Sequence, residues 1–551
     1  MVNTHDGKDW AMSVIRACFL ALLALPGAGE GATTDTDSTA LPVAWSRADG
    51  PFVTVKDGRF VDQDGRQVIL HGVNVGEKHA PYVSWHTAQD YGRMREWGFN
   101  CVRLLTLWAA IEPQCGQYDE EYLERLDERI AWAKQNGLFV MLDMHQDLWG
   151  EKPGWSDGAP VWATLDDGLP HKRGQVWSDA YWMSQAVQAA FDNFWANKPG
   201  PDGVGIQERF ALAWRHVAAR YADEPAVVGF DLLNEPFIGS PILMAALSVA
   251  PQLGKILAAE DGAPLGLSGL TQMLAEGQNR AELVGRLRDT AVYRSLIDAT
   301  APAFQVFERG NLKAMHQRVA NAIREVDRRH VLFLEPSVSS SGGVPSALEP
   351  VLGPDGKSDS YQALAPHAYD IVVDTPDAWT ADEGRLALIF DRHAALAERH
   401  GWPLLLGEWG AFYGSPKVVG AARAYTRLIE ERLASDTYWS FSRKDFDQAA
   451  YFKLLQRPYP MAVAGTLLEY RFDPDSRVLE CRWREQPALT TPTRIYVPSR
   501  WYTEGYDAAC VPVCPGIHTK PVSPGSVNLY LLVPQAGDGG ERTLTLRPKA
   551  R

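Results

Sequence analysis

The stretch 227-VVGFDLLNEPF-237 joins a run of apolar and β-branched residues to an abrupt polar end at Asn234, Glu235 and Pro236. An apolar run this short, without alternating polar residues, is typical of a strand buried on both faces of a parallel sheet. When parallel strands close into a barrel, their carboxyl ends face the active site. The position of Glu235 therefore makes it a candidate catalytic residue.

Seven further runs share this pattern, and helices are predicted between them. Residues 119–137 predict an amphipathic helix that Asp119 caps and Gly137 ends, and residues 208–223 predict another. Eight strands that alternate with helices indicate a closed (β/α)₈ barrel. An open doubly wound sheet is the structural alternative, but no G-x-G-x-x-G fingerprint follows the first strand. In chain order the eight runs are RQVILHGVNV, FNCVRLLTLW, LFVMLDMHQD, VVGFDLLNEP, HVLFLEPS, YQALAPHAY, WPLLLGEWG and TYWSFS.

The 551 residues suffice for a large catalytic domain with a smaller appendage. Beyond about Pro458, short β-rich segments are separated by Pro, Gly and Asp turns, a pattern that predicts a β-sandwich. We therefore expect a signal peptide and leader over residues 1–32, the catalytic barrel over 45–455 and a C-terminal β-sandwich over 458–551.

Two connections of the predicted barrel, at about 148–205 and 237–305, are too long for ordinary barrel loops. The second contains the apolar segment IGSPILMAALSVAPQLGKILAA, which Pro241 and Pro251 interrupt. Two interpretations stay open for this segment: a helical pair that packs on the barrel, or an apolar wall or membrane-touching lip over the active site.

The N-terminus has the order of a secretory signal peptide. Lys8 and Arg16 precede the apolar run ACFLALLAL, and the small residues of PGAGEGATT follow it. The apolar run is too short to span a bilayer. We expect the protein to be secreted, either to the periplasm or outside the cell. Export permits disulfides, and Cys510 and Cys514 are the favoured local pair.

The charge and composition of the chain limit the classes of partner that we expect it to bind. The formal net charge of -14 would repel nucleic acid and anionic surfaces over most of the exterior. The sequence carries neither a nucleotide fingerprint nor Cys/His metal spacing, so we expect no cofactor, no metal and no nucleic acid partner. A monomer is expected, although the sequence leaves the oligomeric state open.

A second glutamate ends another predicted barrel strand. Glu408, in WPLLLGEWGAF, lies at the end of the seventh strand, whereas Glu235 lies at the end of the fourth. Two carboxylates that converge across a barrel mouth are what glycoside hydrolysis needs: one donates a proton to the leaving oxygen, and the other stabilises the developing positive charge on the sugar. Either glutamate alone could be a salt-bridge partner at the barrel rim, but the pair favours catalysis.

With these two motifs the chain resembles glycoside hydrolase family 5, and within it the endoglycoceramidases. The resemblance to the larger clan covers roughly residues 50 to 445, and the C-terminal β-domain also suits endoglycoceramidases. It implies a retaining mechanism in which Glu408 is the nucleophile and Glu235 the acid/base.

The resemblance also implies roles for other residues. Arg103 matches the arginine that hydrogen-bonds the nucleophile, Asn234 the residue that binds the sugar 2-hydroxyl, and Trp439 the aromatic platform beneath the sugar. Lys78 matches a lysine that contacts the sugar nearest the ceramide. Glu335 is a weaker candidate at the end of the fifth strand. Four further positions at the ends of strands three and six match residues of the family active site: His145, Asp147, His367 and Tyr369.

The expected enzyme is thus a retaining endo-β-glycosidase that cleaves between oligosaccharide and ceramide in glycosphingolipids, with transient contact to membranes or lipid micelles. Two enzyme alternatives share the same glutamates: an exo-acting β-glucosidase on glucosylceramide or steryl glucoside, and a family 5 polysaccharide endoglycanase. A carbohydrate- or lipid-binding protein on an inactive barrel is a third alternative, but both glutamates are present.

Overall fold

The computed structural model describes residues 52–549, except for 153, 174–176, 257–284, 374, 376, 414 and 515. The expected leader over residues 1–32 lies outside the described residues. The boundaries expected for the other two domains stay predictions.

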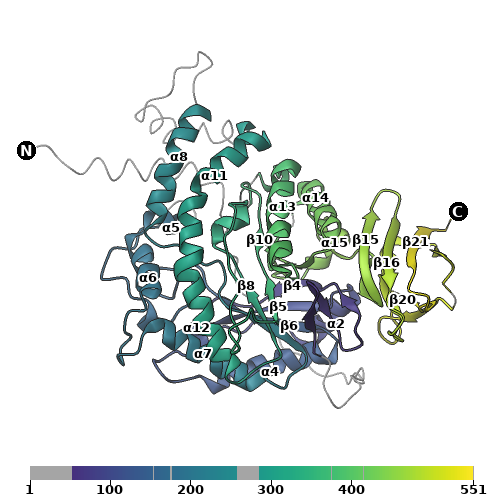
Figure 1. Ribbon diagram of the computed structural model, residues 1–551, viewed down its shortest axis with the longest axis horizontal. Coiled ribbons are helices and arrows are strands. Elements are labelled where there is room, and N and C mark those ends of the chain that lie inside the picture. The colour runs from purple at the N-terminus through teal and green to yellow at the C-terminus, as the bar shows by residue number, and fades with distance from the viewer. Residues whose placement is uncertain are drawn as a thin grey trace, which may run out of the picture.

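A closed barrel of eight parallel strands forms the centre of the molecule (Figure 1). Each strand pairs with its neighbours in the order in which the runs occur along the sequence, and a parallel bridge between Leu364 and Leu404 closes the ring. This confirms the predicted fold. The sixth and seventh strands each have two parts, and their second parts pair His367 with Glu408. The strands are β4 (His71–Val75), β5 (Cys101–Leu107), β6 (Phe139–His145), β7 (Val227–Asp231), β8 (Val331–Leu334), β9 and β10 (Gln362–Leu364, His367–Ala368), β11 and β12 (Leu405–Leu406, Glu408–Trp409) and β13 (Ser435–Tyr438).

Helices surround this ring. The predicted helix at 119–137 is observed as α4, where the Asp119 side chain accepts the N–H of Tyr122 and Gly137 has a left-handed φ of 67°. Only the short η3 lies between β8 and β9, so the barrel departs there from strict alternation. The helices are α2 (Ala88–Glu96), α3 (Trp108–Ile111), α4 (Glu120–Gln135), η1 (Val161–Ala163), α5 (Asp179–Met183), α6 (Gln185–Trp195), α7 (Ile206–Tyr221), α8 (Ile242–Ile256), α11 (Thr290–Phe307), η2 (Glu308–Leu312), α12 (Lys313–Arg324), η3 (Val338–Gly342), η4 (Ala378–Thr380), α13 (Glu383–His400), η5 (Pro416–Val418), α14 (Val419–Glu431), η6 (Phe446–Gln448) and α15 (Phe452–Leu455).

The second long connection forms a helical pair. Helices α8 and α11 pack side by side beyond the carboxyl ends of the strands, as Figure 1 shows at the top of the molecule. As far as it is described, the segment that contains Pro241 and Pro251 is thus one helix and not a pair, because α8 continues through Pro251 and its packing partner α11 comes from a later part of the connection. Helix α8 also exposes apolar side chains: Met244 is 64% and Leu247 51% exposed. Among the described residues, no helix combines the length and hydropathy that a membrane span requires.

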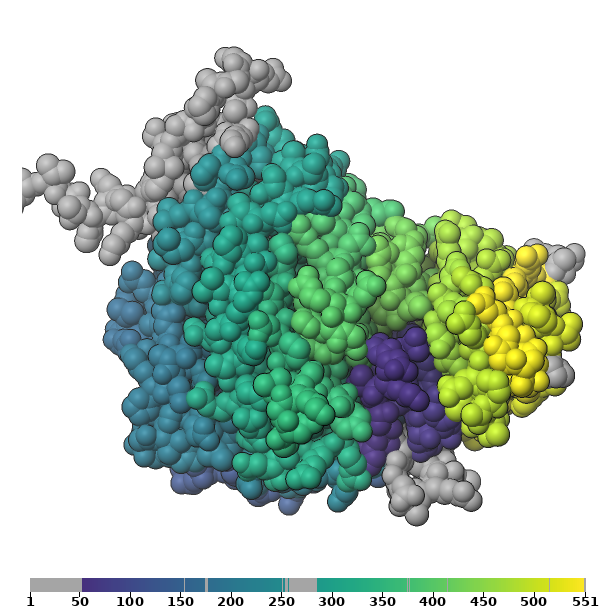
Figure 2. Space-filling model, in the orientation of Figure 1, coloured from purple at the N-terminus to yellow at the C-terminus, as the bar shows by residue number. Residues whose placement is uncertain are grey.

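Two antiparallel sheets form the C-terminal β-sandwich, and one of them includes the N-terminal hairpin. Strand β3 pairs with β14 through Val68 and Ala462, so the hairpin of β1 to β3 extends the sheet of the last domain. Figure 2 shows N-terminal residues, in purple, against the yellow-green part of the C-terminal domain. The hairpin strands are β1 (Thr54–Lys56), β2 (Arg59–Val61) and β3 (Gln67–Val68); the sandwich strands are β14 (Tyr459–Val463), β15 (Gly465–Asp473), β16 (Val478–Glu485), β17 (Thr493–Val497), β18 (Tyr506–Val511), β19 (His518–Pro521), β20 (Leu529–Val533) and β21 (Glu541–Pro548), with the short helix η7 (Ser499–Trp501).

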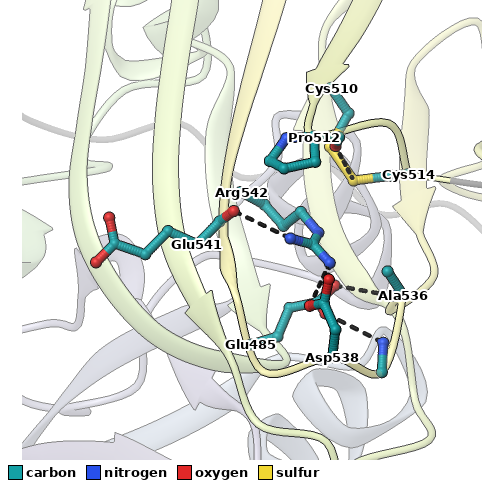
Figure 3. Close-up of a disulfide and its surroundings, with 9 residues drawn as sticks. Glu485, Cys510, Pro512, Cys514, Ala536, Asp538, Glu541 and Arg542 are labelled. Atoms are coloured by element: carbon teal, nitrogen blue, oxygen red, sulfur yellow. Dashed lines mark hydrogen bonds and ion pairs between the residues drawn. A yellow bond between two sulfur atoms is a disulfide. The ribbon is translucent and has the colours of Figure 1, made fainter.

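A disulfide joins Cys510 to Cys514 at the end of β18, which confirms the predicted local pair (Figure 3). In the same region the buried Arg542 forms ion pairs with Glu485 and Asp538, the first at 3.3 Å. The remaining described cysteines, Cys101, Cys115 and Cys481, are free thiols.

Candidate active site

Arg103 projects from the middle of β5 into the centre of the barrel, where it is fully buried. Its guanidinium contacts four carboxylates and two amide oxygens, and we call this group the Arg103 cluster. A single buried cation satisfies several carboxylates here because the guanidinium fork offers five donors. The contacts of Arg103 are with Glu408 (2.8 Å), Asp143 (2.8 Å), Asp231 (2.9 Å), Glu335 (2.9 Å), Asn234 (2.9 Å) and Asn74 (3.1 Å).

Glu408 begins β12 and is held from two sides. Arg103 donates to its Oε1 at 2.8 Å, and the hydroxyl of Tyr369 donates to its Oε2 at 2.9 Å. Burial raises the pKa of Glu408 to about 7, and the charges of His367 and Arg103 oppose that rise. The donors favour the ionised form, which is the form a nucleophile needs.

Glu235 follows β7 at a sharp change of chain direction. Its φ of 43° lies in the left-handed region, which is uncommon for a residue with a side chain. Three contacts hold it there. Its N–H donates to Oε2 of Glu335 at 2.8 Å, its carbonyl accepts from Gln146 at 3.1 Å, and its Oε1 lies 2.8 Å from Nδ1 of His367. This backbone turn directs the carboxyl toward the barrel axis and Glu408.

The two glutamates are close enough to act on one sugar carbon. Oxygens of Glu235 and Glu408 lie within 4.8 Å of each other, and both approach Nδ1 of His367. Retaining glycosidases place their carboxyls about 5 to 5.5 Å apart, whereas inverting enzymes leave about 6.5 to 9.5 Å for a water. The observed geometry therefore fits direct attack by one carboxylate.

His367 is the charged neighbour of both glutamates. Burial alone would lower its pKa, but the carboxylates of Glu335 and Glu408 outweigh burial and hold the pKa well above the ordinary value. His367 is therefore an imidazolium near neutral pH. Burial raises the pKa of Glu335, and also that of Asp143, to about 7.

A second group of residues lines one side of the same site. Lys78 forms an ion pair with Asp147 and lies 4.7 Å above the ring of Trp439. The Trp439 ring is nearly parallel to that of His145, at 5.5 Å between centroids. Burial lowers the pKa of His145 well below its ordinary value, so this imidazole is neutral; its Nδ1 contacts Asp143 at 2.7 Å. The group combines an aromatic face with charged and neutral hydrogen-bonding groups, as a sugar site requires.

Within the described part of the chain, three groups of residues bring possible metal ligands together, and each has a positively charged side chain of the protein beside or within it. In the first group, Arg103 forms ion pairs with the carboxylates of Asp143, Asp231 and Glu335. The other two groups are Glu235 with His367 and Glu408, where His367 is the cation, and His145 with Asp147 and Asp157, where Lys78 contacts Asp147. The side chains of the protein thus supply the counter-ions in this donor set.

Two pockets meet at Glu235 and Tyr369. A polar pocket of about 370 Å³ is lined by both glutamates together with the residues around Trp439. An apolar pocket of about 510 Å³ adjoins it, and Glu235 and Tyr369 line both. The apolar pocket is lined otherwise by Tyr181, Trp182, Phe237, Ile242, Phe304, Val338, Ser339 and Ser341.

The structure brings all ten sequence-predicted site residues into this region: Lys78, Arg103, His145, Asp147, Asn234, Glu235, His367, Tyr369, Glu408 and Trp439. Asn234 accepts from Arg103 and donates to the Gln146 carbonyl at 3.1 Å, which leaves one amide proton for a ligand. Sequence reasoning missed Asp143 and Asp231, although a carboxylate inside an apolar run was a usable signal. It also missed Trp177, which lines the polar pocket from a long connection without periodicity.

A (β/α)₈ barrel with paired carboxylates at the ends of strands four and seven defines an O-glycosyl hydrolase. Residues 61–244 and 278–445 match the model of the Cellulase family, glycosyl hydrolase family 5. Residues 457–545 match the glycoside hydrolase family 5 C-terminal domain. The chain belongs to glycoside hydrolase family 5.

Known endoglycoceramidases match most of the chain. Endoglycoceramidase I of Rhodococcus hoagii is 27% identical over 526 residues, which are 91% of this chain and 90% of that protein. Endo-glycoceramidase II from Rhodococcus sp. has been solved as a lactosyl-enzyme intermediate, with 29% identity, a TM-score of 0.68 and coverage of 91% of this chain and 100% of that one. Its complex with ganglioside GM3 gives 28% identity, a TM-score of 0.69 and coverage of 89% and 99%.

Proposed function

We propose that this enzyme hydrolyses the β-glycosidic bond between the oligosaccharide and the ceramide of glycosphingolipids, with retention of configuration. The observation that carries the proposal is the meeting of a polar and an apolar pocket at Glu235. A glycosphingolipid has a polar and an apolar part joined by one bond, and this geometry places that bond beside the proton donor. The ganglioside and lactosyl complexes of the related structures support it.

In the first step, the ionised Glu408 attacks the anomeric carbon while Glu235 gives its proton to the ceramide oxygen. The C–O bond to ceramide breaks, and a glycosyl ester forms on Glu408. Arg103 and Tyr369 hold the attacking carboxylate in place through the hydrogen bonds at 2.8 and 2.9 Å. Ceramide then leaves through the apolar pocket.

In the second step, water replaces ceramide beside Glu235, which now acts as the base. Esterification has removed the negative charge of Glu408, while the His367 imidazolium remains against Glu235 at 2.8 Å. Glu235 is the carboxylate in place to take the proton of that water. Water attacks the anomeric carbon as Glu235 takes its proton, the bond from that carbon to Glu408 breaks, and the oligosaccharide is released with its original configuration.

The polar pocket provides roles for the remaining residues. Trp439 offers a ring face beneath the sugar, and Lys78 and Asp147 offer a charged pair to its hydroxyls. The neutral imidazole of His145 faces the same pocket and serves as a hydrogen-bonding group without adding charge. We assign these four residues to sugar binding.

Product analysis tests the proposal. The purified enzyme is incubated separately with a ganglioside, lactosylceramide and glucosylceramide, and the products are identified by mass spectrometry. Intact oligosaccharide and free ceramide are expected, and Glu408→Gln should abolish both. Glu383→Gln, at a glutamate whose side chain is 65% exposed on the surface, serves as the matched control and should retain activity.

Two other outcomes would replace the proposal. Release of glucose from glucosylceramide alone would indicate an exo-acting enzyme, whose sugar site holds a single unit. Cleavage of a β-glucan without cleavage of any lipid would indicate a polysaccharide endoglycanase, and the apolar pocket would then have a packing role only.

We further propose that α8 touches the lipid aggregate from which the substrate is taken. Ile242 of this helix lines the apolar pocket, while Leu243, Met244 and Leu247 are exposed on the same helix. An apolar surface that continues from the pocket to the exterior gives a ceramide chain a route that avoids water.

We also propose that the protein is exported, on the strength of the basic, apolar and small residues within 1–32 and the Cys510–Cys514 disulfide. N-terminal sequencing of the protein recovered from its native host tests this. A new N-terminus near residue 32 supports export, whereas an intact Met1 contradicts it.

A further inference from the structure

Glu335, the residue after β8, contacts the acid/base residue in two different ways. Its Oε2 accepts the main-chain N–H of Glu235 at 2.8 Å. Its Oε1 lies 3.2 Å from Nε2 of His367, whose other nitrogen, Nδ1, lies 2.8 Å from the carboxylate of Glu235. One buried carboxylate thus reaches both the backbone and, through an imidazole, the side chain of Glu235.

The backbone contact acts on a strained residue. Glu235 has a φ of 43°, and a left-handed conformation persists at a residue with a side chain only where its surroundings fix it. The bond from the Glu235 N–H to Glu335 fixes it from β8, and the bond from Gln146 to the Glu235 carbonyl fixes it from the end of β6.

The imidazole contact acts on the carboxyl. His367 occupies Oε1 of Glu235, so the proton that is passed to a leaving group is directed to Oε2. This pose depends on charge, because the negative charge of Glu335 contributes most to holding the buried His367 as an imidazolium. The charged or titratable groups around Glu335 are Arg103 from β5, Asp143 from β6, Asp231 and Glu235 from β7 and the turn after it, and His367 from β10.

We propose that Glu335 is a positioning residue for proton transfer by Glu235: it fixes the backbone of Glu235 and, through His367, the orientation of its carboxyl. The inference rests on the proposed roles of Glu235 and Glu408. Because Glu335 also contacts Arg103, which holds the nucleophile, the test must separate the acid/base from the nucleophile.

Two soluble substrates make that separation. Phenyl β-lactoside has a poor leaving group, phenolate, that needs protonation. The leaving group of 2,4-dinitrophenyl β-lactoside, dinitrophenolate, departs without help from an acid. Both need the nucleophile equally. The value of kcat/KM reports the step in which the leaving group departs, and the ratio of the two values is independent of how much of a variant is correctly folded.

For Glu335→Gln we expect kcat/KM on the phenyl substrate to fall by roughly 10-fold to 100-fold, within the usual range of general acid catalysis, and that on the dinitrophenyl substrate to fall far less. Losing the negative charge should also lower the pKa of His367. Because the imidazolium orients the Glu235 carboxyl, proton transfer should then be lost at a lower pH, and the basic limb of the pH profile for the phenyl substrate should move to lower pH. Glu335→Asp keeps the charge but has a shorter side chain. It should lower the ratio of kcat/KM on the phenyl substrate to kcat/KM on the dinitrophenyl substrate, and it should move the basic limb less than Glu335→Gln does.

Asp143→Asn is the matched control. Asp143 contacts the same guanidinium at 2.8 Å and His145 at 2.7 Å, so its loss acts through Arg103 and through the sugar pocket, which both substrates use equally. It should slow both substrates to a similar extent. An equal loss on both substrates for Glu335→Gln, with an unmoved basic limb, would overturn the proposal and leave Glu335 as packing around Arg103.

The proposed function fails in a different way. If Glu408→Gln keeps its activity on the dinitrophenyl substrate, or Glu235→Gln keeps its activity on the phenyl substrate, the assignment of the two glutamates is wrong. If both variants behave as expected and Glu335→Gln shows no leaving-group dependence, only the inference on Glu335 is wrong.

Discussion

A carboxylate oxygen of Glu235 lies within 4.8 Å of one of Glu408. The two residues reach this separation from opposite sides of the barrel, through the turn after β7 and the start of β12. At this distance a sugar carbon fits between them, but an additional water beneath the sugar does not.

The first prediction concerns stereochemistry. Hydrolysis of an aryl β-lactoside should release the β-anomer first, because the short separation requires two successive displacements. Proton NMR spectra recorded in the first minutes, before mutarotation, distinguish the anomers. Early appearance of the α-anomer would show that water attacks directly.

The second prediction concerns pH. The ionised form of Glu408 is the reactive one, and burial raises its pKa to about 7. Protonation of Glu408 therefore removes activity as the pH falls through about 7, so the acid limb of kcat/KM should lie well above the ordinary range of a glutamate. Stopped assays from about pH 4 to about pH 9, which span the ordinary pKa of a glutamate and the raised one, will locate this acid limb. A limb near the ordinary glutamate value would contradict the predicted role of burial.

Tyr369→Phe gives the third prediction. The Tyr369 hydroxyl donates to Glu408 at 2.9 Å, and a hydrogen bond to the charged form lowers the pKa. Without it, the acid limb should move to higher pH, and kcat/KM at pH 7 should fall by roughly 10-fold, corresponding to the loss of a hydrogen bond to a charged group. Tyr413→Phe, at a tyrosine 38% exposed on the surface, is the control and should leave the limb in place. An unmoved limb in Tyr369→Phe would mean that this hydroxyl does not tune the nucleophile.

The fourth prediction concerns the Arg103 cluster. Arg103→Lys keeps one positive charge but loses the fork that contacts four carboxylates, which leaves buried charges unpaired. We expect a loss of about 3 to 5 kcal/mol in the free energy of unfolding, measured by urea denaturation, together with loss of activity. Arg215→Lys, at an exposed pair with Glu325, should change neither. A fully stable but inactive Arg103→Lys protein would show that the cluster serves catalysis alone.

The fifth prediction separates lipid from sugar recognition. Trp182→Ala removes a wall of the apolar pocket and should raise KM for lactosylceramide in detergent while leaving aryl lactosides unaffected. Replacing Met244 and Leu247 with Ser should slow hydrolysis of lactosylceramide in vesicles more than in detergent, since both side chains are exposed. Equal effects on all substrates would place these residues in folding rather than in lipid contact.

Much of this arrangement could be predicted because short stretches of the sequence indicate each strand of the barrel. Each strand is a short apolar run, and Glu235 and Glu408 interrupt two such runs at their ends, so burial and position along the chain identify them together. Arg103, the one basic residue of β5, was predicted instead from the resemblance to the family.

What escaped prediction depends on contacts between distant segments. Glu335 was only a weaker candidate because its neighbours in the sequence do not indicate its hydrogen bond to Glu235 or its ion pair with His367, which come from other strands. The short connection between β8 and β9 and the place of Trp177 in the polar pocket likewise depend on packing, not on periodicity.

The pairing of Val68 with Ala462 has a practical consequence for anyone who recombines these domains. A cut near residue 458 would not release an intact sandwich, because three of its strands precede the barrel in the chain. Such a fragment would expose the edge of β14 and invite pairing with other chains. A chimaera or circular permutant must therefore transfer residues 54–68 together with the C-terminal domain. This domain is built from segments on both sides of the barrel in the sequence and cannot be detached by a single cut.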